Sequence, residues 1–294
     1  MRDAKRKQKP PVSIIGAGRL GTALAVALAD KSYSIGSLVA RTVASARRAA
    51  KLLDHLDEDV QILAAKDVGL LRPADLFLIT TPDDQIAHVA SELARLETTR
   101  ARAQKPTALH TSGALSAEVL APLRKSGWST GSIHPLISVS GMTTALDGAF
   151  WSVEGDKTAL RMAKTIVRDL GGKSFSIRSE DKPLYHAAAV MSAGNVVALF
   201  DVALEMLVQC GLSRKTARSI LLPLLASTVH NLETKDTSAA LTGTFARGDV
   251  ETVKRHLKAL KINKDALDLY RLLGKRSLKL SKGHPQITQM LDSV

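Results

Sequence analysis

Cysteine is almost absent from this sequence, and aromatic residues are scarce. The one cysteine among the 294 residues is Cys210, so we expect neither a disulfide framework nor a cysteine-based metal centre, and we predict no metal site. Aromatic residues make up 3% of the chain, which leaves few rings on which nucleic-acid bases could stack.

Long hydrophobic runs are missing as well. No apolar run reaches the roughly 18 residues that a membrane-spanning helix needs. The basic N-terminus is not followed by the apolar segment of a secretory signal. We therefore predict a cytoplasmic protein with no membrane partner. A hydrophobic fraction of 45% over 294 residues is sufficient for a folded protein with two domains.

The net charge of +13 is concentrated at the two ends of the chain. Residues 1–10 carry five basic side chains and one acidic one, and they lack core-forming residues, which predicts a disordered basic arm. Residues 251–282 carry ten basic and three acidic side chains, and Arg271, Lys275 and Lys279 form one helical stripe. We interpret both as solvated basic surfaces and predict no nucleic-acid partner, although a positive surface can attract an anionic ligand.

Three glycines stand where a short strand gives way to a helix. The segment VSIIGAGRLGTAL, residues 12–24, begins with a β-branched run and continues into an alanine- and leucine-rich helix. Gly16 permits a tight turn, Gly18 allows a pyrophosphate to approach the backbone, and Gly21 lets the helix pack closely on the strand. The helix N-terminus then favours the phosphates. The predicted cofactor-binding residues of this turn are Gly16, Ala17, Gly18, Arg19, Leu20 and Gly21.

Acidic residues are missing after the second predicted strand, residues 34–41. A site that prefers NAD usually carries Asp or Glu at this point to bind the ribose 2′-hydroxyl, but no acid occurs between Asp30 and Asp54. Arg41 and Thr42 stand there instead. Because a guanidinium binds a phosphate and a carboxylate repels one, the sequence predicts NADP(H). The alternative is that Arg41 only begins the next helix.

Strand and helix patterns continue to alternate up to about residue 178. Strand patterns begin the segments 60–65, 74–86, 107–116 and 131–136, and two further strands at 149–155 and 173–178 flank a helix. Ligands of such sheets lie beyond the carboxyl ends of the strands. Three residues there, Thr80, Thr81 and Pro82, are therefore predicted to border the cofactor. The next strand ends carry His110, Ser112 and His134.

From about residue 179 only helical patterns remain. Residues 179–211 are predicted to form one long helix, with Ser179 as its N-cap and a nearly uniform apolar surface that predicts burial, for instance at a subunit interface. A second helix contains Pro223, a loop spans 241–249, and two further helices close the fold. We predict an α/β protein with a disordered arm at 1–10, a doubly wound NADP-binding Rossmann domain at 11–178 and an all-helical dimerisation and substrate domain at 179–294.

Three polar residues interrupt the apolar helix, namely His186, Ser192 and Asn195. A buried polar group needs a hydrogen-bond partner, which could be a substrate, a neighbouring helix or the helix's own backbone. His186 and Asn195 are nine residues apart and so face opposite sides of an ideal helix. We expect them to serve one site only if the helix is bent or a second subunit contributes, and taken singly we favour a structural role for each.

Six motifs, in order along the chain, carry a family resemblance. They are IIGAGRLGTAL, TTPDDQI, HTSGALSAEVL, SIHPL, YHAAAVMSAGN and LTGTFARGDVETVKRHLKAL. Together they resemble bacterial Rossmann-like proteins with a C-terminal domain of unknown function. That family is described as NADP oxidoreductases and is similar to pyrroline-5-carboxylate reductase, ketopantoate reductase and the β-hydroxyacid dehydrogenases. The resemblance covers about residues 12–280 and implies a fold like that of 6-phosphogluconate dehydrogenase, a homodimer formed by the helical domain, and an active site in the interdomain cleft.

The chain departs from the β-hydroxyacid dehydrogenases at their proton-transfer residues. Those enzymes carry a Lys on the first helix of the second domain and an Asn four residues later. Here Lys182 is the only lysine near the start of that helix, and no Asn follows at that spacing. The resemblance therefore leaves His186 or Tyr185 to replace the lysine as the acid.

A hydride acceptor must also receive a proton, and histidine has a suitable ordinary pKa of about 6.5. We rank His186 first as the donor, followed by His110, Ser112 and His134, with Asn195 as a further candidate. The alternative for each histidine is that it only orients a loop. Arg247 is a candidate for binding a substrate carboxylate, and its alternative is a surface arginine beside a helix cap.

Four functions remain open from the sequence. The first is an NADP-dependent oxidoreductase that acts on a small carbonyl compound or hydroxy acid. The second is an imine reductase, and the third is a non-catalytic NADP-binding sensor or assembly protein, which the missing Lys–Asn pair favours. The fourth, nucleic-acid binding through the basic C-terminal stripe, is the weakest.

Overall fold

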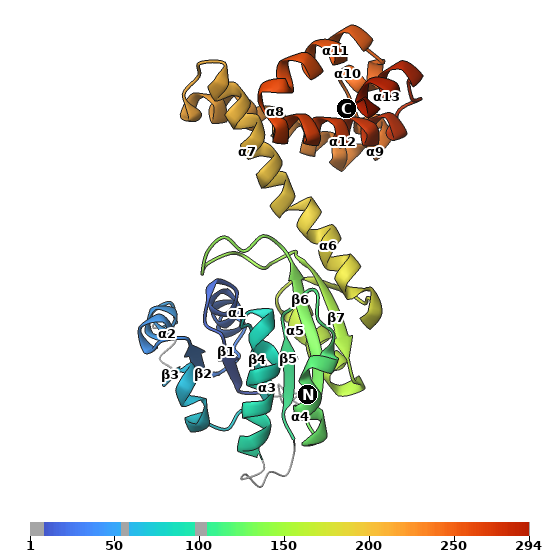
Figure 1. Ribbon diagram of the computed structural model, residues 1–294. Coiled ribbons are helices and arrows are strands. Elements are labelled where there is room, and N and C mark those ends of the chain that lie inside the picture. Colours follow the sequence, from blue (N-terminus) through green and yellow to red (C-terminus); the bar gives the residue numbers. More distant parts are fainter. Residues whose placement is uncertain (1–8, 54–58, 98–104, 294) are drawn as a thin grey trace, which may run out of the picture. The chain divides into compact units, whose positions relative to one another are not determined.

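The computed structural model describes residues 9–53, 59–97 and 105–293 (Figure 1). Most of the predicted basic arm at 1–10 therefore lies outside the described residues. The packing divides the chain into two compact units, Met1–Ala193 and Gly194–Val294, which we call the sheet unit and the helical unit. The predicted domain boundary after residue 178 follows the last strand, whereas the division by packing comes one helix later.

The sheet unit is built on one eight-stranded sheet. Its strands are β1 (Val12–Ile15), β2 (Ile35–Ala40), β3 (Gln61–Ala64), β4 (Leu76–Ile79), β5 (Thr107–His110), β6 (Ser129–Leu136), β7 (Phe150–Gly155) and β8 (Lys173–Phe175). They lie in the order β3-β2-β1-β4-β5-β6-β7-β8, and every neighbouring pair is parallel except β6 and β7. The chain reverses direction across the sheet between β1 and β4, which confirms the predicted doubly wound fold and marks the place where such sheets bind ligands.

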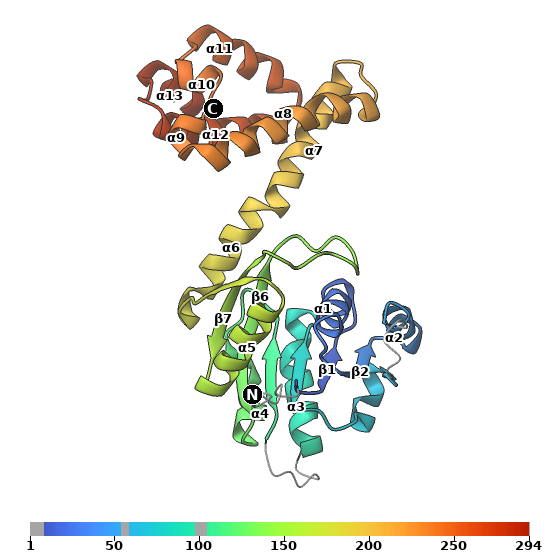
Figure 2. The same cartoon turned by 180° about the vertical axis from the view of Figure 1, so that it is seen from behind.

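Helices cover both faces of this sheet (Figures 1 and 2). One face is covered by α1 (Arg19–Ala29), α2 (Val43–Ala50) and α5 (Lys157–Asp169), and the other by α3 (Asp83–Glu97) and α4 (Ala121–Lys125). Successive side chains of a strand point to opposite faces. Ile14 accordingly packs in one core with Leu24 and Ile166, while Ile15 packs in the other with Ile86.

The last part of the sheet unit brings a helix to the carboxyl edge of the sheet. Short 3₁₀ segments precede it, namely η2 (Ala65–Leu70), η3 (Ala117–Leu120) and η4 (Ser179–Asp181), and the helix itself is α6 (Lys182–Ser192). Ser179 does not cap a long helix as predicted. It lies in η4, where its hydroxyl donates a hydrogen bond to Glu154 Oε1 at 3.0 Å.

The predicted single helix at 179–211 is interrupted. α6 ends at Ser192, Ala193 has non-helical dihedrals (φ −126°, ψ −76°), and α7 (Gly194–Gln209) begins at the following glycine. The prediction of one continuous helix was wrong because glycine is a poor helix former and the packing division of the chain falls at this point.

The predicted burial of this segment is also not found within the single chain. Met191 is 67% exposed and Val197 is 71% exposed. Contrary to the expectation from apolar runs, Ser179–Gln209 is long and apolar enough to cross a membrane by length and composition alone. One such segment is weak evidence for a membrane protein, and this one contains the break at Ala193.

The helical unit continues from α7 through a series of helices. They are α8 (Arg214–Thr234), α9 (Thr237–Ala240), α10 (Thr244–Arg247), α11 (Val250–Ala259), η5 (Leu260–Ile262), α12 (Lys264–Leu280) and α13 (Pro285–Asp292). Its core is small and contains Val253, Leu278, Ile287 and Leu291. The predicted loop at 241–249 is wrong in part, because α10 forms within it.

A final helix follows the one that was predicted to close the fold. Part of the basic stripe on α12 holds α13 in place: Arg271 donates a hydrogen bond to the Ser293 carbonyl at 2.7 Å, and Lys275 forms an ion pair with Asp292 at 2.5 Å. Two of the three stripe residues therefore have partners within the chain, and the absence of a nucleic-acid partner stays a prediction.

Candidate active site

The glycine turn is packed against the end of β4. Gly16 has φ +113°, and a β-carbon on it would lie 2.6 Å from the backbone of Thr80 and Thr81. A β-carbon on Gly21 would lie 2.3 Å from the Gly16 carbonyl oxygen, to which Thr80 Oγ1 also donates a hydrogen bond at 2.8 Å. Both glycines are therefore required by the fold itself.

Gly18 differs from the other two glycines because it faces open space. A β-carbon on Gly18 would meet only the Gly16 carbonyl oxygen, at 3.8 Å. Gly18 is also the N-cap of α1, where no side chain caps the helix and no acid stands in the first turn. The first backbone amides of a helix lack acceptors within it, so this turn has the geometry that binds an anion.

The other predicted cofactor residues lie around the same edge. Ala17 is buried, Arg19 and Pro82 are exposed and Leu20 is half-buried. The Thr81 hydroxyl is buried and, among the described residues, has no hydrogen-bond partner. An unpartnered hydroxyl beside an open glycine turn fits a site that a polar ligand completes.

Cationic and hydroxyl groups gather where β2 ends. Arg41 directly follows the strand and is exposed, and Thr42 caps α2 by accepting a hydrogen bond from the Ser45 amide at 3.2 Å. Arg48 Nη2 donates a hydrogen bond to Ser45 Oγ at 2.9 Å, which brings a second guanidinium to the same helix start. The alternative that Arg41 begins α2 is not supported, because α2 starts at Val43.

His110 is not placed to transfer a proton. It is fully buried at the end of β5, where its Nε2 lies 3.2 Å from the Ser116 carbonyl oxygen and its Nδ1 accepts a hydrogen bond from the Ser112 amide at 3.2 Å. Burial first, and the Lys182 charge second, lower the pKa of His110 to about 3. These contacts favour the alternative given above, a neutral ring that orients the loop after β5.

Ser112 also organises this loop. Its hydroxyl donates to Asp83 Oδ2 at 2.8 Å and accepts hydrogen bonds from the amides of Ala114 and Leu115, at 3.2 and 3.0 Å. The hydroxyl hydrogen is used in the bond to Asp83. Ser112 thus joins the start of α3 to the loop that follows β5, and its predicted catalytic role stays a prediction.

His134 and Tyr185 form a hydrogen-bonded pair between β6 and α6. His134 Nδ1 lies 2.8 Å from the Tyr185 hydroxyl, and the rings meet edge to face. Burial first, then the nearby His186 and Lys182, lower the pKa of His134 to about 4, and burial raises the pKa of Tyr185 to about 12. Both groups are therefore neutral at pH 7. If the phenol donates to Nδ1, the single ring proton of His134 is on Nε2.

Gly113 lies between the second nitrogen of His134 and a nitrogen of His186. A β-carbon on Gly113 would lie 2.8 Å from His134 Nε2 and 2.5 Å from His186 Nδ1. His186 Nδ1 is buried and has no hydrogen-bond partner among the described residues. The two histidine rings stand edge to face, with centroids 5.6 Å apart. These two nitrogens therefore pack closely against Gly113, where a β-carbon would not fit.

Sequence reasoning dismissed Lys182, which lies directly beside this cluster. Its side chain is fully buried, and its Nζ donates a hydrogen bond to Ser132 Oγ at 2.6 Å and lies 3.8 Å from Glu154 Oε2. The available signal was a lysine one helical turn before Tyr185 and His186. We set it aside because no Asn followed at the spacing known from the resembling enzymes.

The remaining predicted site residues lie outside this cluster. Ser192 Oγ donates to the Ala188 carbonyl at 3.0 Å, so its partner is its own helix. Asn195 on α7 and Arg247 at the end of α10 belong to the helical unit, and both are exposed. Their roles in catalysis and in substrate binding stay predictions.

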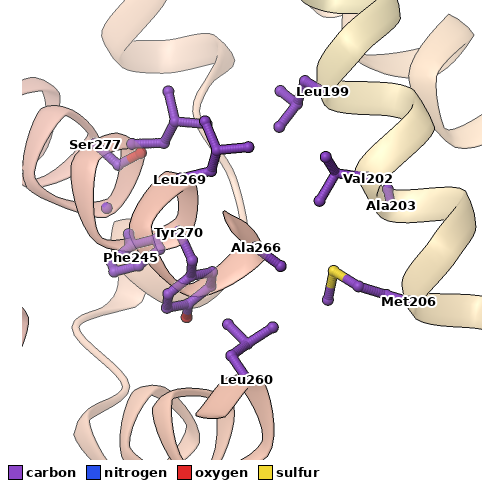
Figure 3. Close-up of a pocket in the computed structure, with 12 residues that line it drawn as sticks. Leu199, Val202, Ala203, Met206, Phe245, Leu260, Ala266, Leu269, Tyr270 and Ser277 are labelled. Atoms are coloured by element: carbon purple, nitrogen blue, oxygen red, sulfur yellow. The ribbon is translucent and has the colours of Figure 1, made fainter. Parts of the chain in front are cut away.

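The helical unit contains an apolar pocket of its own between α7 and α12 (Figure 3). Val202 and Met206 of α7 face Leu269 and Tyr270 of α12 across it. None of its lining residues is charged, and the hydroxyls of Tyr270 and Ser277 are its only side-chain oxygen atoms. The lining of this pocket is therefore suited to apolar groups.

Comparison with known proteins assigns the family. Residues 2–135 match the Rossmann-like domain family, and residues 149–277 match the family described as domain of unknown function DUF2520. The chain belongs to the Rossmann-like proteins that carry a DUF2520 domain. This confirms the family predicted from the six motifs. No curated protein matches this chain.

Solved structures resemble this chain over almost its full length. BF3122 from Bacteroides fragilis, provisionally named an NADP oxidoreductase, is 23% identical with a TM-score of 0.73, and protein TM1727 from Thermotoga maritima is 26% identical with a TM-score of 0.70. Each match covers 92% of this chain and 98% of the other. A 1-pyrroline-5-carboxylate reductase from Streptococcus pyogenes is 15% identical, with a TM-score of 0.59 and coverage of 92% and 99%. At these identities the similarity supports the fold.

Proposed function

We propose that this protein is an NADP(H)-dependent oxidoreductase that reduces a C=O or C=N group of a small molecule. The carrying observation is that a phosphate-binding turn and a pair of converging histidines lie at the carboxyl edge of the same sheet. The turn is at the ends of β1 and β4, His134 lies near the end of β6, and His186 on α6 stands edge to face against its ring. The reductases and oxidoreductases of similar fold support the same assignment.

The residues of the first turn fit a dinucleotide. The open face of Gly18 and the amides of Arg19 and Leu20 would hold the diphosphate, and the Thr81 hydroxyl would complete the border. Arg41, with Thr42 and the Ser45–Arg48 pair behind it, would bind the 2′-phosphate. When bound, NADPH supplies the hydride.

His134 is the proton donor that the geometry favours. Its Nδ1 is engaged by Tyr185, which leaves Nε2, beside Gly113, as the ring nitrogen that would donate to a reacting oxygen or nitrogen. As Nε2 gives up its proton, Nδ1 takes the Tyr185 hydroxyl proton, and Tyr185 regains one from water. The ring stays neutral throughout, which suits a histidine whose pKa is about 4. An alkoxide or amide anion is basic enough to draw this proton.

His186 supports the same site as a second polar contact. Its buried Nδ1 lacks a partner in the described part of the chain, and a hydroxyl or amine of the substrate would satisfy it. This reverses the order given by the sequence, in which His186 ranked above His134. The reason is the Tyr185 hydrogen bond, which fixes His134 and which spacing alone did not reveal.

The function is tested by the loss of NADPH absorbance with a panel of 2-oxo acids, branched keto acids and cyclic imines. We expect at least one class to be reduced, and the preferred class distinguishes a carbonyl reductase from an imine reductase. Tight NADPH binding without turnover of any panel member would contradict catalysis and favour the sensor.

The preference for NADPH over NADH is tested separately by the substitution Arg41→Asp. We expect this variant to bind NADPH about 100-fold more weakly than the wild type and NADH with little change, because a carboxylate would face the 2′-phosphate. Calorimetric titration with both nucleotides measures the two affinities. Equal losses for NADPH and NADH would show that Arg41 does not contact that group.

We also propose that the helical unit forms a homodimer, as the family resemblance implied. Its exposed apolar side chains on α7 and α8, such as Val197, Ile220 and Leu224, support this proposal because a monomeric protein seldom leaves so many in water. Sedimentation velocity measures the oligomeric state, and a monomer at micromolar concentration would contradict a stable dimer.

A further inference from the structure

One fully buried charged side chain stands beside the proposed site. Among the described residues, Lys182 is the only charged group classed as buried, with no exposed surface at all. A buried ammonium is costly unless it is paired and hydrogen-bonded. The proposed proton transfer does not use Lys182, so the presence of a charged side chain at this buried position needs a reason.

The contacts of Lys182 reach every element that carries the site. Its Nζ donates to Ser132 Oγ at 2.6 Å, and Ser132 lies two residues before His134 and on the same face of β6. The Ser112 carbonyl oxygen lies 3.5 Å from the same Nζ, and the next residue is Gly113. Lys182 itself precedes Tyr185 and His186 by one helical turn of α6.

Glu154 on β7 pairs with the positive charge of Lys182. Its Oε2 lies 3.8 Å from Lys182 Nζ, while its Oε1 accepts hydrogen bonds from the Ala117 amide at 3.1 Å and from Ser179 Oγ at 3.0 Å. Lys182 and Glu154 together therefore connect β5, β6, β7 and the start of α6.

We propose that Lys182 is a positioning residue that holds His134 in its neutral Nε2–H form against Tyr185. Its two hydrogen bonds join α6 to the segments that carry Gly113 and His134, and its positive charge opposes the addition of a second proton to the ring. This rests on the proposed function for its catalytic consequence, but the state of the ring can be measured without a substrate. Lys182 thus differs from a lysine that itself protonates the substrate.

Other charged and titratable groups face His134 as well. They are Tyr185 and His186 on α6 and His110 at the end of β5, while Glu154 and Asp83 act on Lys182. The two carboxylates raise the pKa of Lys182, and His186, like Lys182, lowers the pKa of His134. The test must therefore remove the lysine charge without leaving Glu154 unpaired.

The experiment uses the full chain labelled with ¹⁵N-histidine and reads the ring nitrogens of His134 by NMR from pH 8 to pH 3. In the wild type we expect a single neutral tautomer, protonated on Nε2, down to about pH 5. The variants are Lys182→Met and Lys182→Met/Glu154→Gln, with Lys164→Met on the exposed face of α5 as the control. The double variant is included because the single one leaves a carboxylate without its cation.

In the folded double variant we expect the midpoint of His134 to rise by at least about half a pH unit, with both neutral tautomers present. Lys164→Met should change neither property. An unchanged tautomer and midpoint in the folded double variant would overturn the proposal, as would a wild-type ring protonated on Nδ1. If the variants show the expected NMR changes but the wild-type protein reduces no substrate, the positioning role of Lys182 is supported and the proposed reaction is contradicted.

Discussion

The chain contains two His–Tyr pairs of almost the same geometry, one in each unit. His134 Nδ1 lies 2.8 Å from the Tyr185 hydroxyl, and His256 Nδ1 lies 2.8 Å from the Tyr270 hydroxyl. In both pairs the ring centroids are 5.6 Å apart and the planes meet at 87°. The hydrogen bond alone therefore cannot distinguish a reactive histidine from a structural one.

The surroundings of the two pairs are what differ. His134 is mostly buried, with a second histidine and a buried lysine nearby, and its Nε2 lies against Gly113, which has no side chain. His256 is exposed on α11 and packs only against the ring of Tyr270, which in turn contacts Phe245. A reactive site needs a directed proton in a sheltered space, and only the first pair provides both.

Replacing each histidine should give the largest difference between the pairs. We expect His134→Asn to lower kcat about 10²- to 10⁴-fold, because it removes the Nε2–H donor. His256→Asn should retain wild-type kcat. Steady-state oxidation of NADPH with the preferred substrate measures both variants. Equal losses would mean that the two pairs do not differ in function.

Acid should destabilise the fold through the two buried histidines of the sheet unit, His134 and His110. The pKa values of His134 and His110 are lowered in the folded state to about 4 and about 3, so the unfolded chain binds protons first. Stability is therefore lost as the pH falls from about 6.5 towards 4, by about 2 kcal/mol per histidine at pH 5 as an order of magnitude.

Denaturant titrations followed by tryptophan fluorescence report this loss, since both tryptophans, Trp128 and Trp151, lie in the sheet unit. His134→Asn should remove part of the difference between pH 7 and pH 5, and His256→Asn should leave it unchanged. A pH dependence that is the same in wild type and His134→Asn would show that His134 titrates normally.

Removing the phenols should give a smaller contrast. Tyr185→Phe is expected to lower kcat about tenfold, because the His134 ring loses the partner that selects its tautomer and relays its proton. Tyr270→Phe should not change kcat. Measured KM values should stay close to wild type in both, and a tenfold loss in Tyr270→Phe would argue that the phenols act through stability.

The sequence predicted those features that depend on local chemistry. The glycine turn, the doubly wound sheet and the missing acid after β2 follow from spacing and residue type, and the structure packs Gly16 and Gly21 against Thr80, a contact that the sequence did not predict. The roles of the histidines did not follow in this way. His110 differs from His134 only in partners such as the Ser116 carbonyl and the Tyr185 hydroxyl, and tertiary packing supplies these.

The environment of Lys182 likewise could not be predicted from the sequence. It depends on contacts with Ser132 and Glu154, which lie on two other strands and carry no recognisable motif. The break at Ala193 was missed because the residues on both sides are good helix formers and only Gly194 weakens the pattern.

Calorimetric titration of NADPH into the wild type and into Gly18→Ala tests the dinucleotide site most directly. Since a β-carbon on Gly18 meets no atom closer than 3.8 Å, we expect the melting temperature of this variant to stay at the wild-type value. Its affinity for NADPH should fall at least about tenfold, because the new methyl group occupies the place of the diphosphate. Equal affinity in the two proteins, or no binding of NADPH by the wild type, would contradict the assignment of this turn as a cofactor site.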